Sequence, residues 1–175
     1  MASTDDGGAL VWGDQTTENR GLGQRLAFAW PRFVGEPSQM PLSRLIYTSL
    51  RESRSPRDLI EILEQSEARN AVDAITGALV TTPDFYVQLL EGEHKAVDAC
   101  YERICRDPRH SQVELILFEL IDERWFPDWS MSAVDLSEGD AIASYSEGKE
   151  FRPKELPSAV VERLFRDVAA RLRRS

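Results

Sequence analysis

The chain has 175 residues, of which 42% are hydrophobic, and it carries a formal net charge of −9 at pH 7. This length and hydrophobic content suit one globular domain with appended segments. The negative charge excludes a general surface for nucleic acid or anionic membranes, because both bind positively charged surfaces, so we expect proteins or small molecules as partners.

Residues 1–40 predict a flexible N-terminal extension. They hold six of the ten glycines, mixed with polar residues, and show no sustained periodicity. An exception is RLAFAWPRFV, residues 25–34, where Leu26, Phe28 and Trp30 alternate like a short strand that stops at the following proline. We expect this segment to dock on the domain or on a partner.

Nothing in the sequence predicts export or a membrane anchor. The N-terminus is acidic where a signal peptide would be basic, and no apolar run reaches the length of a membrane span. Cys100 and Cys105 lie five residues apart in a helical pattern, a spacing that points them to different faces and does not suit a disulfide. Cys105 is expected on the apolar side of that helix, together with Val97, Tyr101 and Ile104. We therefore expect a cytoplasmic protein.

Residues 41–136 predict a domain of strands and helices. The expected elements are strand 42–49, helix 55–70, strands 74–82 and 84–92, helix 94–107, and strands 112–121 and 129–136. Ser55 fits the N-cap of the first helix and Pro56 its first position, while Thr-Pro-Asp at 82–84 fits a hairpin turn. The order βαββαββ predicts an α+β ferredoxin-like sandwich, in which an antiparallel or mixed five-stranded sheet carries both helices on one face.

Residues 137–175 predict a C-terminal helical cap or output region. A short helix is expected within 137–145 and a longer one within 156–174. The longer helix carries an apolar stripe of Val161, Leu164, Phe165, Val168 and Leu172, with arginines on its polar side. We expect this stripe to cover the open face of the sheet. The alternative is a basic helix that binds a membrane surface or a partner protein.

The usual catalytic signatures are missing from the sequence. It contains no GxSxG, Walker, HExxH or GxGxxG motif. His94 and His110 are the only histidines, and with the two cysteines they lack any recognised metal-ligand spacing. The sequence therefore predicts neither an enzyme nor a metal site.

Polar residues that interrupt apolar segments are a stronger indication of function than any catalytic motif. Gln88 interrupts the strand FYVQLLEG, Tyr47 and Ser49 share one face of the first strand, and Asn70 closes the first helix. Each alone has an ordinary explanation, such as a core tyrosine or a helix cap. Together they predict a planar polar ligand between the two helices, above the sheet.

The sequence resembles the BLUF domain, a family named for blue light using flavin. The segments that carry the resemblance follow one another over residues 42–135: RLIYTS, DLIEILEQSEARNAVDAITGAL, FYVQLLEG, YERICRDPRH and RWFPDWSM. The resemblance implies a short photoreceptor that binds flavin non-covalently, as FAD or alternatively as FMN or riboflavin.

By this resemblance, Tyr47 is the phenol near the flavin and Gln88 is the amide between that phenol and the flavin N5 and O4 edge. Asn70 is the amide that holds the polar rim of the ring. The family works by light-driven electron and proton transfer from the tyrosine to the flavin, and return of both leaves the glutamine rotated or tautomerised. An amide suits this role because it both donates and accepts hydrogen bonds. A new hydrogen bond to flavin O4 would shift the absorption to the red.

The resemblance implies further site residues. The residues around the family's glutamine are matched by Ser49, Trp129 and Met131. Positions near the ribityl and phosphate end of the flavin are matched by Asp107, Arg109 and His110. Arg69 is a departure, since it stands at a flavin contact where many members carry histidine or asparagine.

No cyclase, phosphodiesterase or DNA-binding segment follows the matched region. We therefore expect output in trans through a downstream signalling protein, a homo-oligomer (dimer or larger), and no nucleic acid or membrane partner. Two alternatives remain open. One is a flavin-dependent redox enzyme of the same fold, which would need an open substrate site. The other is a ferredoxin-like regulatory module without a cofactor, which a colourless purified protein would favour.

Overall fold

The structure is a computed structural model that describes residues 41–128, 131–136, 143–146 and 150–174. The strand predicted within 25–34 and Trp129 lie outside the described residues.

Five strands form a single mixed sheet. They are β1 (Leu42–Arg51), β2 (Thr76–Thr81), β3 (Phe85–Glu93), β4 (His110–Ile121) and β5 (Ser132–Asp135), in the spatial order β4-β1-β3-β2-β5. β1 pairs antiparallel with β3 and β4, and β2 pairs antiparallel with β3. β5 joins the sheet parallel to β2. The predicted mixed five-stranded sheet is confirmed, and β3, which carries Gln88, lies at its centre.

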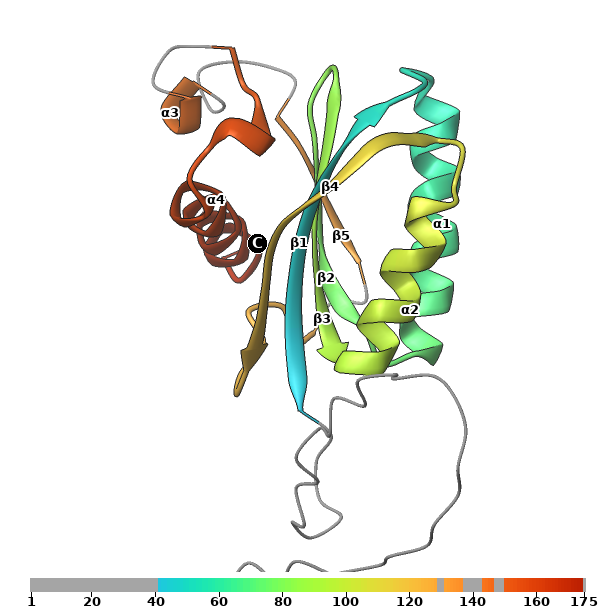
Figure 1. Cartoon of the computed structure of the whole chain (residues 1–175), viewed down its shortest axis with the longest axis vertical. Coiled ribbons are helices and arrows are strands. Elements are labelled where there is room, and N and C mark those ends of the chain that lie inside the picture. The colour runs from blue at the N-terminus through green and yellow to red at the C-terminus, as the bar shows by residue number, and fades with distance from the viewer. Residues whose placement is uncertain (1–40, 129–130, 137–142, 147–149, 175) are drawn as a thin grey trace, which may run out of the picture. The chain divides into compact units, whose positions relative to one another are not determined.

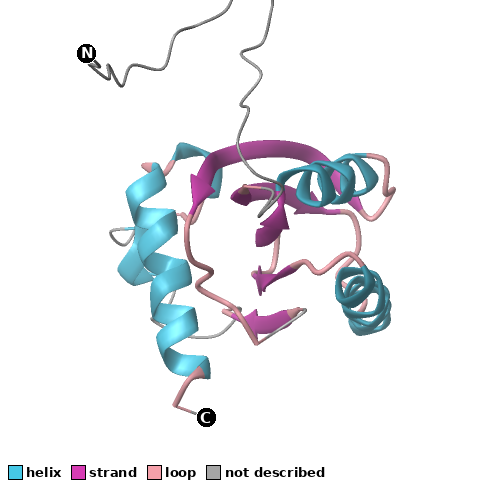
Figure 2. Ribbon diagram, turned by 90° about the horizontal axis from the view of Figure 1, so that it is seen from below, coloured by secondary structure: helices cyan, strands magenta, loops and turns pink. Residues whose placement is uncertain are grey.

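Helices cover both faces of the sheet. On one face lie α1 (Pro56–Val72) and α2 (His94–Cys105), and on the other lies α4 (Ser158–Leu172), as Figures 1 and 2 show. The shorter α3 (Ala143–Ser146) and the 3-10 helix η1 (Pro153–Glu155) precede α4. This arrangement is the ferredoxin-like sandwich that the element order predicts.

The first helix and the hairpin differ in small ways from the prediction. Ser55 is the N-cap of α1, but its side chain makes no capping hydrogen bond, and α1 continues two residues beyond Asn70. The β2–β3 turn is closed by the Thr82 amide, which donates to the Phe85 carbonyl over 3.0 Å. Within the hairpin, a Cβ at Gly77 would lie 2.0 Å from the Leu89 carbonyl oxygen, so only glycine fits there.

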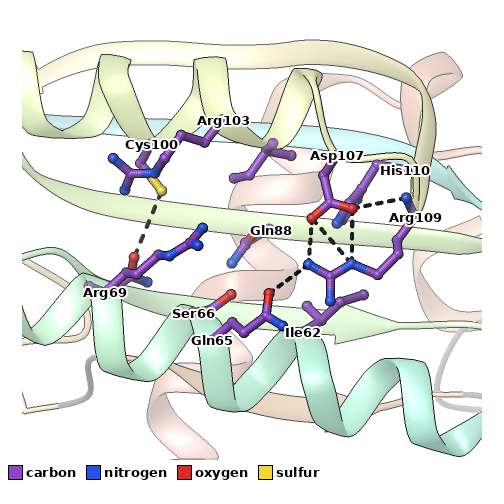
Figure 3. Close-up of a pocket in the computed structure, with 12 residues that line it drawn as sticks. Ile62, Gln65, Ser66, Arg69, Gln88, Cys100, Arg103, Asp107, Arg109 and His110 are labelled. Atoms are coloured by element: carbon purple, nitrogen blue, oxygen red, sulfur yellow. Dashed lines mark hydrogen bonds and ion pairs between the residues drawn. The ribbon is translucent and has the colours of Figure 1, made fainter.

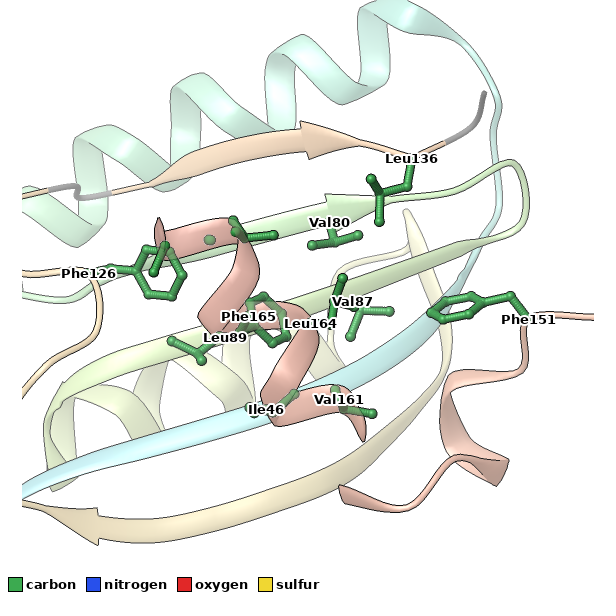
Figure 4. Packing of buried hydrophobic residues seen from close by; sticks show 13 residues of the cluster. Ile46, Val80, Val87, Leu89, Phe126, Leu136, Phe151, Val161, Leu164 and Phe165 are labelled. Atoms are coloured by element: carbon green, nitrogen blue, oxygen red, sulfur yellow. The ribbon is translucent and has the colours of Figure 1, made fainter. Parts of the chain in front are cut away.

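The apolar stripe of α4 packs on the open face of the sheet, as predicted. Val161, Leu164, Phe165 and Val168 are buried in a cluster with sheet residues such as Ile46, Val80, Val87 and Leu89 (Figure 4). Phe165 meets Phe126 edge to face, with ring centroids 6.4 Å apart. The apolar stripe of α4 is therefore part of the hydrophobic core. No helix in the described part of the chain is long and apolar enough to span a bilayer.

A buried ion pair ties the β4–β5 connection to the sheet. The Arg44 guanidinium, 4% exposed, donates through Nε to Glu91 Oε1 over 2.7 Å and lies 3.4 Å from the centre of the Trp125 ring. Glu91 also accepts hydrogen bonds from the backbone amides of Trp125 and Phe126, at 2.9 and 3.0 Å. Arg166 of α4 lies 4.5 Å from the same indole ring. This network holds Trp125 and Phe126 of the β4–β5 connection against the sheet.

Candidate functional site

A cavity lies between α1 and α2, above β3. It has about 520 Å³ of empty space, including the part that opens to solvent. Figure 3 shows its lining side chains. They are Ile62, Gln65, Ser66, Arg69 and Asn70 from α1, Gln88 from β3, Cys100, Arg103 and Ile104 from α2, and Asp107, Arg109 and His110 after α2. The structure thus brings together six of the residues proposed for the site from the sequence.

The floor of the cavity is a chain of three hydrogen-bonded side chains. Tyr47 on β1 lies directly opposite Gln88 on β3, so both side chains point to the same face. The Tyr47 hydroxyl donates to Gln88 Oε1. Gln88 Nε2 in turn donates to the Met131 sulfur, 3.2 Å away. Burial raises the pKa of Tyr47 well above its ordinary value, so the phenol is a neutral donor.

The amide of Gln88 retains hydrogen-bonding capacity toward the cavity. It is buried, at 4% exposure, and its nitrogen carries two N–H donors. One of them faces the Met131 thioether, a weak acceptor, and the other has no partner among the described residues. A buried amide donor without a partner costs about 1–3 kcal/mol, so a ligand acceptor at this position would be stabilised.

The two helices contact each other across the cavity wall at Asn70 and Cys100. The Cys100 thiol donates to Asn70 Oδ1 over 3.8 Å, and both side chains are buried. Burial raises the pKa of Cys100, which keeps the thiol protonated at neutral pH. Asn70 is therefore a buried polar residue within α1 that faces α2. A helix cap would instead lie at the end of the helix.

Arginines surround the mouth of the cavity. The mouth is lined by Glu61, Gln65, Arg69, Arg103, Asp107, Pro108 and Arg109. Arg109 forms an ion pair with Asp107 and also donates to Gln65 Oε1 over 3.0 Å. The hydrogen bond from Arg109 lowers the pKa of Asp107. Three arginines against two carboxylates leave a local positive charge on a chain whose net charge is −9.

His110 and Ser49 form a second polar pair beneath the cavity. Ser49 Oγ lies 2.8 Å from His110 Nδ1, and the imidazole ring centre is 6.2 Å from that of Tyr47. Burial lowers the pKa of His110 to about 4, so the ring is neutral at pH 7. Ser49 shares the face of Tyr47, as the two-residue period predicts, and its hydroxyl bonds to the histidine.

Comparison with known proteins decides the family. A family model described as "Sensors of blue-light using FAD" matches residues 42–132, which include β1 to β4, the floor of the cavity and its mouth. The chain belongs to the BLUF family.

Relatives of this BLUF chain include proteins of very different length. Photoactivated adenylate cyclase subunit beta of Euglena gracilis is 36% identical over 102 residues, 57% of this chain and 12% of that protein. The blue light- and temperature-regulated antirepressor BluF of Escherichia coli (strain K12) is 32% identical over 96 residues, 54% of this chain and 24% of that protein. The chain thus matches only a small part of these two relatives.

A solved structure matches most of the BLUF chain. The dark-state structure of the BLUF protein BlrB has a TM-score of 0.65 and 34% sequence identity, covering 74% of this chain and 96% of that one. This similarity confirms the ferredoxin-like fold.

BLUF domains bind flavin, and the cavity offers what such a ring requires. An isoalloxazine ring has apolar faces and a polar edge of donors and acceptors. Ile62 and Ile104 supply apolar surface, and Gln88 and Asn70 supply amides at the floor and wall. The free N–H of Gln88 and the positive mouth suit a carbonyl acceptor and phosphates, respectively. The residues present therefore fit a flavin.

Several residues that line the BLUF cavity were missed by the sequence analysis. They are Ile62, Gln65, Ser66, Cys100, Arg103 and Ile104. The helical period would have found them, because residues three, four or seven positions from Arg69 and Asn70 on α1, and from Asp107 after α2, share the same face. Trp129, the tryptophan proposed near Gln88, lies outside the described residues.

Proposed function

We propose that this chain is a blue-light photoreceptor that holds FAD between α1 and α2 and signals through protein contacts, without an enzymatic reaction of its own. The observation that carries the proposal is the buried chain from Tyr47 through Gln88 to Met131 at the cavity floor. It links a proton donor, the Tyr47 hydroxyl, to an amide that can turn and so reverse its hydrogen bonds. The last residue of the chain of bonds, Met131, directly precedes β5.

Bound flavin supplies the light absorption and, once excited, an electron acceptor. The residues of the chain supply the path of the proton and the hydrogen bonds that stay rearranged after illumination. Tyr47 is buried and neutral, so loss of an electron to the excited flavin would release its hydroxyl proton along the hydrogen bond to Gln88 Oε1, and return of the electron would bring the proton back to the hydroxyl. If the amide then turns, Nε2 faces the phenol and Oε1 faces Met131. A thioether sulfur cannot donate to that oxygen, so the Gln88–Met131 bond is lost.

The remaining site residues are proposed to hold the cofactor. Asn70 would bond to the polar rim of the ring from the cavity wall, and Arg69 would approach it from the same helix. The Asp107–Arg109 pair and His110 would border the ribityl and phosphate end. Trp129 and Ser49 are proposed to complete the surroundings of the amide.

The form of the flavin gives a testable prediction. FAD and FMN carry phosphate where riboflavin has none, and a charge-assisted hydrogen bond contributes about 1.5–3 kcal/mol. Arg109→Ala should therefore weaken FAD and FMN binding by roughly 10- to 100-fold, with little effect on riboflavin. Titration of the apoprotein with the three flavins measures this difference.

A matched control for that titration is Arg106→Ala. Arg106 lies three residues away, pairs with Glu102 on the surface and does not line the cavity or its mouth. It should leave all three affinities unchanged. Equal losses for riboflavin and FAD in Arg109→Ala would show that Arg109 shapes the cavity and does not hold a phosphate.

Output is proposed to run from Met131 into the C-terminal region, residues 137–175. Loss of the Gln88–Met131 bond would free the segment that precedes β5, and Leu136 at the end of β5 packs in the same cluster as α4. We expect blue light to raise amide hydrogen exchange in β5 and α4 by roughly tenfold. Gln88→Leu, with flavin bound, should show no such increase. Identical exchange in darkness and under light, with the lit spectrum fully formed, would exclude this route.

The receiver is proposed to be a signalling protein acting in trans, and the receptor itself a homo-oligomer. Two relatives act, by their names, as a photoactivated cyclase and as an antirepressor, and the match covers only 12% and 24% of their lengths. The thiols of Cys100 and Cys105 are free, which fits the proposed cytoplasmic location.

A further inference from the structure

Cys100 forms part of the cavity wall between the two helices. It lies on α2 with 6% of its surface exposed, and it packs in a buried cluster with Tyr47 and Val97, which fixes the position of its sulfur. From there its thiol donates to Asn70 Oδ1 on α1 over 3.8 Å, the dashed line that starts at Cys100 in Figure 3. The wall therefore holds a hydrogen-bond donor against a residue that is proposed to bind the cofactor.

Asn70 is anchored through its main chain. Its carbonyl oxygen accepts from the Ile75 amide over 2.8 Å, and Ile75 is buried in the same cluster as Cys100. A side-chain amide on a fixed backbone can still turn about its last bond, which exchanges its oxygen and its NH2 group. A thiol is a donor and only a weak acceptor. Contact with Cys100 therefore favours the orientation in which Oδ1 faces α2.

The thiol of Cys100 stays a donor at neutral pH. Burial raises its pKa, and this effect outweighs the nearby positive charge of Arg103, which lowers it. Arg103 is itself held by Asp73, at 2.9 Å. A thiolate would instead attract the NH2 group of Asn70 and favour the reversed amide.

We infer that Cys100 is a positioning residue for the flavin: its S–H bond to Asn70 Oδ1 holds the Asn70 amide in the orientation that matches the polar rim of the ring. This inference rests on the proposed flavin site and assigns the group that orients its amide. The rim of an isoalloxazine sets carbonyl oxygens beside a ring N–H. A reversed amide would place oxygen against oxygen and N–H against N–H, which leaves buried polar atoms unpaired.

A second observation in the same cavity indicates a polar ligand independently of Cys100. Gln88 is 4% exposed, and one of its N–H donors has no partner among the described residues. Two buried amides thus border one cavity, Gln88 at its floor and Asn70 at its wall. Correct pairing with a planar ligand requires that both amides have a defined orientation.

Titration of the apoprotein with FAD separates positioning from simple packing. Cys100→Val keeps the space between the helices filled but removes the donor, and Cys100→Ala removes both. Each should raise the Kd for FAD by roughly 3- to 10-fold, the effect of one neutral hydrogen bond. Cys105→Ser is the matched control, because Cys105 is exposed and does not line the cavity. If Cys100→Val bound FAD as the native chain does, Cys100 would only fill space.

A double-mutant cycle tests whether Cys100 acts through Asn70. Asn70→Ala should itself weaken FAD binding. Adding Cys100→Val to Asn70→Ala should then change the Kd by less than about twofold, because no amide remains to be oriented. Circular dichroism shows whether each variant is folded. Losses that add in the double variant would overturn the inference, since Cys100 would then act independently of Asn70.

The S–H stretching band in the infrared spectrum tests the bond without flavin. The chain has two cysteines, so in Cys105→Ser the remaining band belongs to Cys100. A hydrogen-bonded S–H absorbs at lower wavenumber than a free one, so Asn70→Ala should raise the wavenumber of this band in the apoprotein. An unshifted band, in a chain that binds FAD, overturns the role of Cys100 alone. A shifted band in a chain that binds no flavin overturns the proposed function, and the role of Cys100 with it.

Discussion

Gln88→Leu should abolish the reversible light-induced red shift completely while flavin stays bound. Leucine fills nearly the same volume in this buried position, so the cavity should persist. It has neither the oxygen that accepts from Tyr47 nor the nitrogen that donates to Met131, so no turned state can exist. Absorption spectra of the purified variant before and after blue light measure the loss directly.

A matched control lies in the same cavity. Gln65→Leu removes another amide, exposed at the mouth, where it accepts only from Arg109. This variant should keep the full shift.

Tyr47→Phe should lose the shift as Gln88→Leu does. Tyr101→Phe, whose ring centre is 5.7 Å from that of Tyr47, should retain it. A full shift in Gln88→Leu or Tyr47→Phe would remove both residues from the switch.

Glu91→Ala should lower the free energy of unfolding by about 3–5 kcal/mol, the cost of breaking a buried ion pair on one side. The substitution leaves the Arg44 guanidinium, which is buried, with Glu119 as its remaining carboxylate. It also removes the acceptor of the Trp125 and Phe126 amides. Urea denaturation followed by circular dichroism measures the change.

Asp84→Ala is the control for that measurement. It breaks the ion pair with Arg54, in which both side chains are more than half exposed. Water already screens such a pair, so its loss should cost less than about 1 kcal/mol. If the two variants were equally destabilised, the Arg44–Glu91 pair would contribute no more than a surface contact.

The sequence predicted elements better than it predicted contacts between them. The period of two in the strands and of about 3.6 in the helices identified the sandwich and the covering role of α4. Arg44 was not singled out, because in an alternating strand a charged residue is expected to face solvent. Only the packing of Trp125 and α4 over that face reveals it as buried.

The same limit applies to the site. Tyr47 and Gln88 were recognised as unusual, but their hydrogen bond depends on the register between β1 and β3, which local pattern does not specify. In α2 the prediction for Cys105 was wrong. Cys105 is exposed and Cys100 takes the buried position facing Asn70, because the helix turns its Val97–Cys100 side toward the sheet. A shift of one residue position in the helical period decides which of the two cysteines is buried.

We propose that a bound flavin and the Tyr47–Gln88 pair make this chain a light sensor. The most direct test is the absorption spectrum of the purified full chain in darkness, after blue light and during return to darkness, without added substrate or reductant. We expect a yellow protein whose flavin bands move to longer wavelength under light and return fully in the dark. A protein that holds no flavin, or a flavin whose spectrum does not shift under blue light, would contradict it.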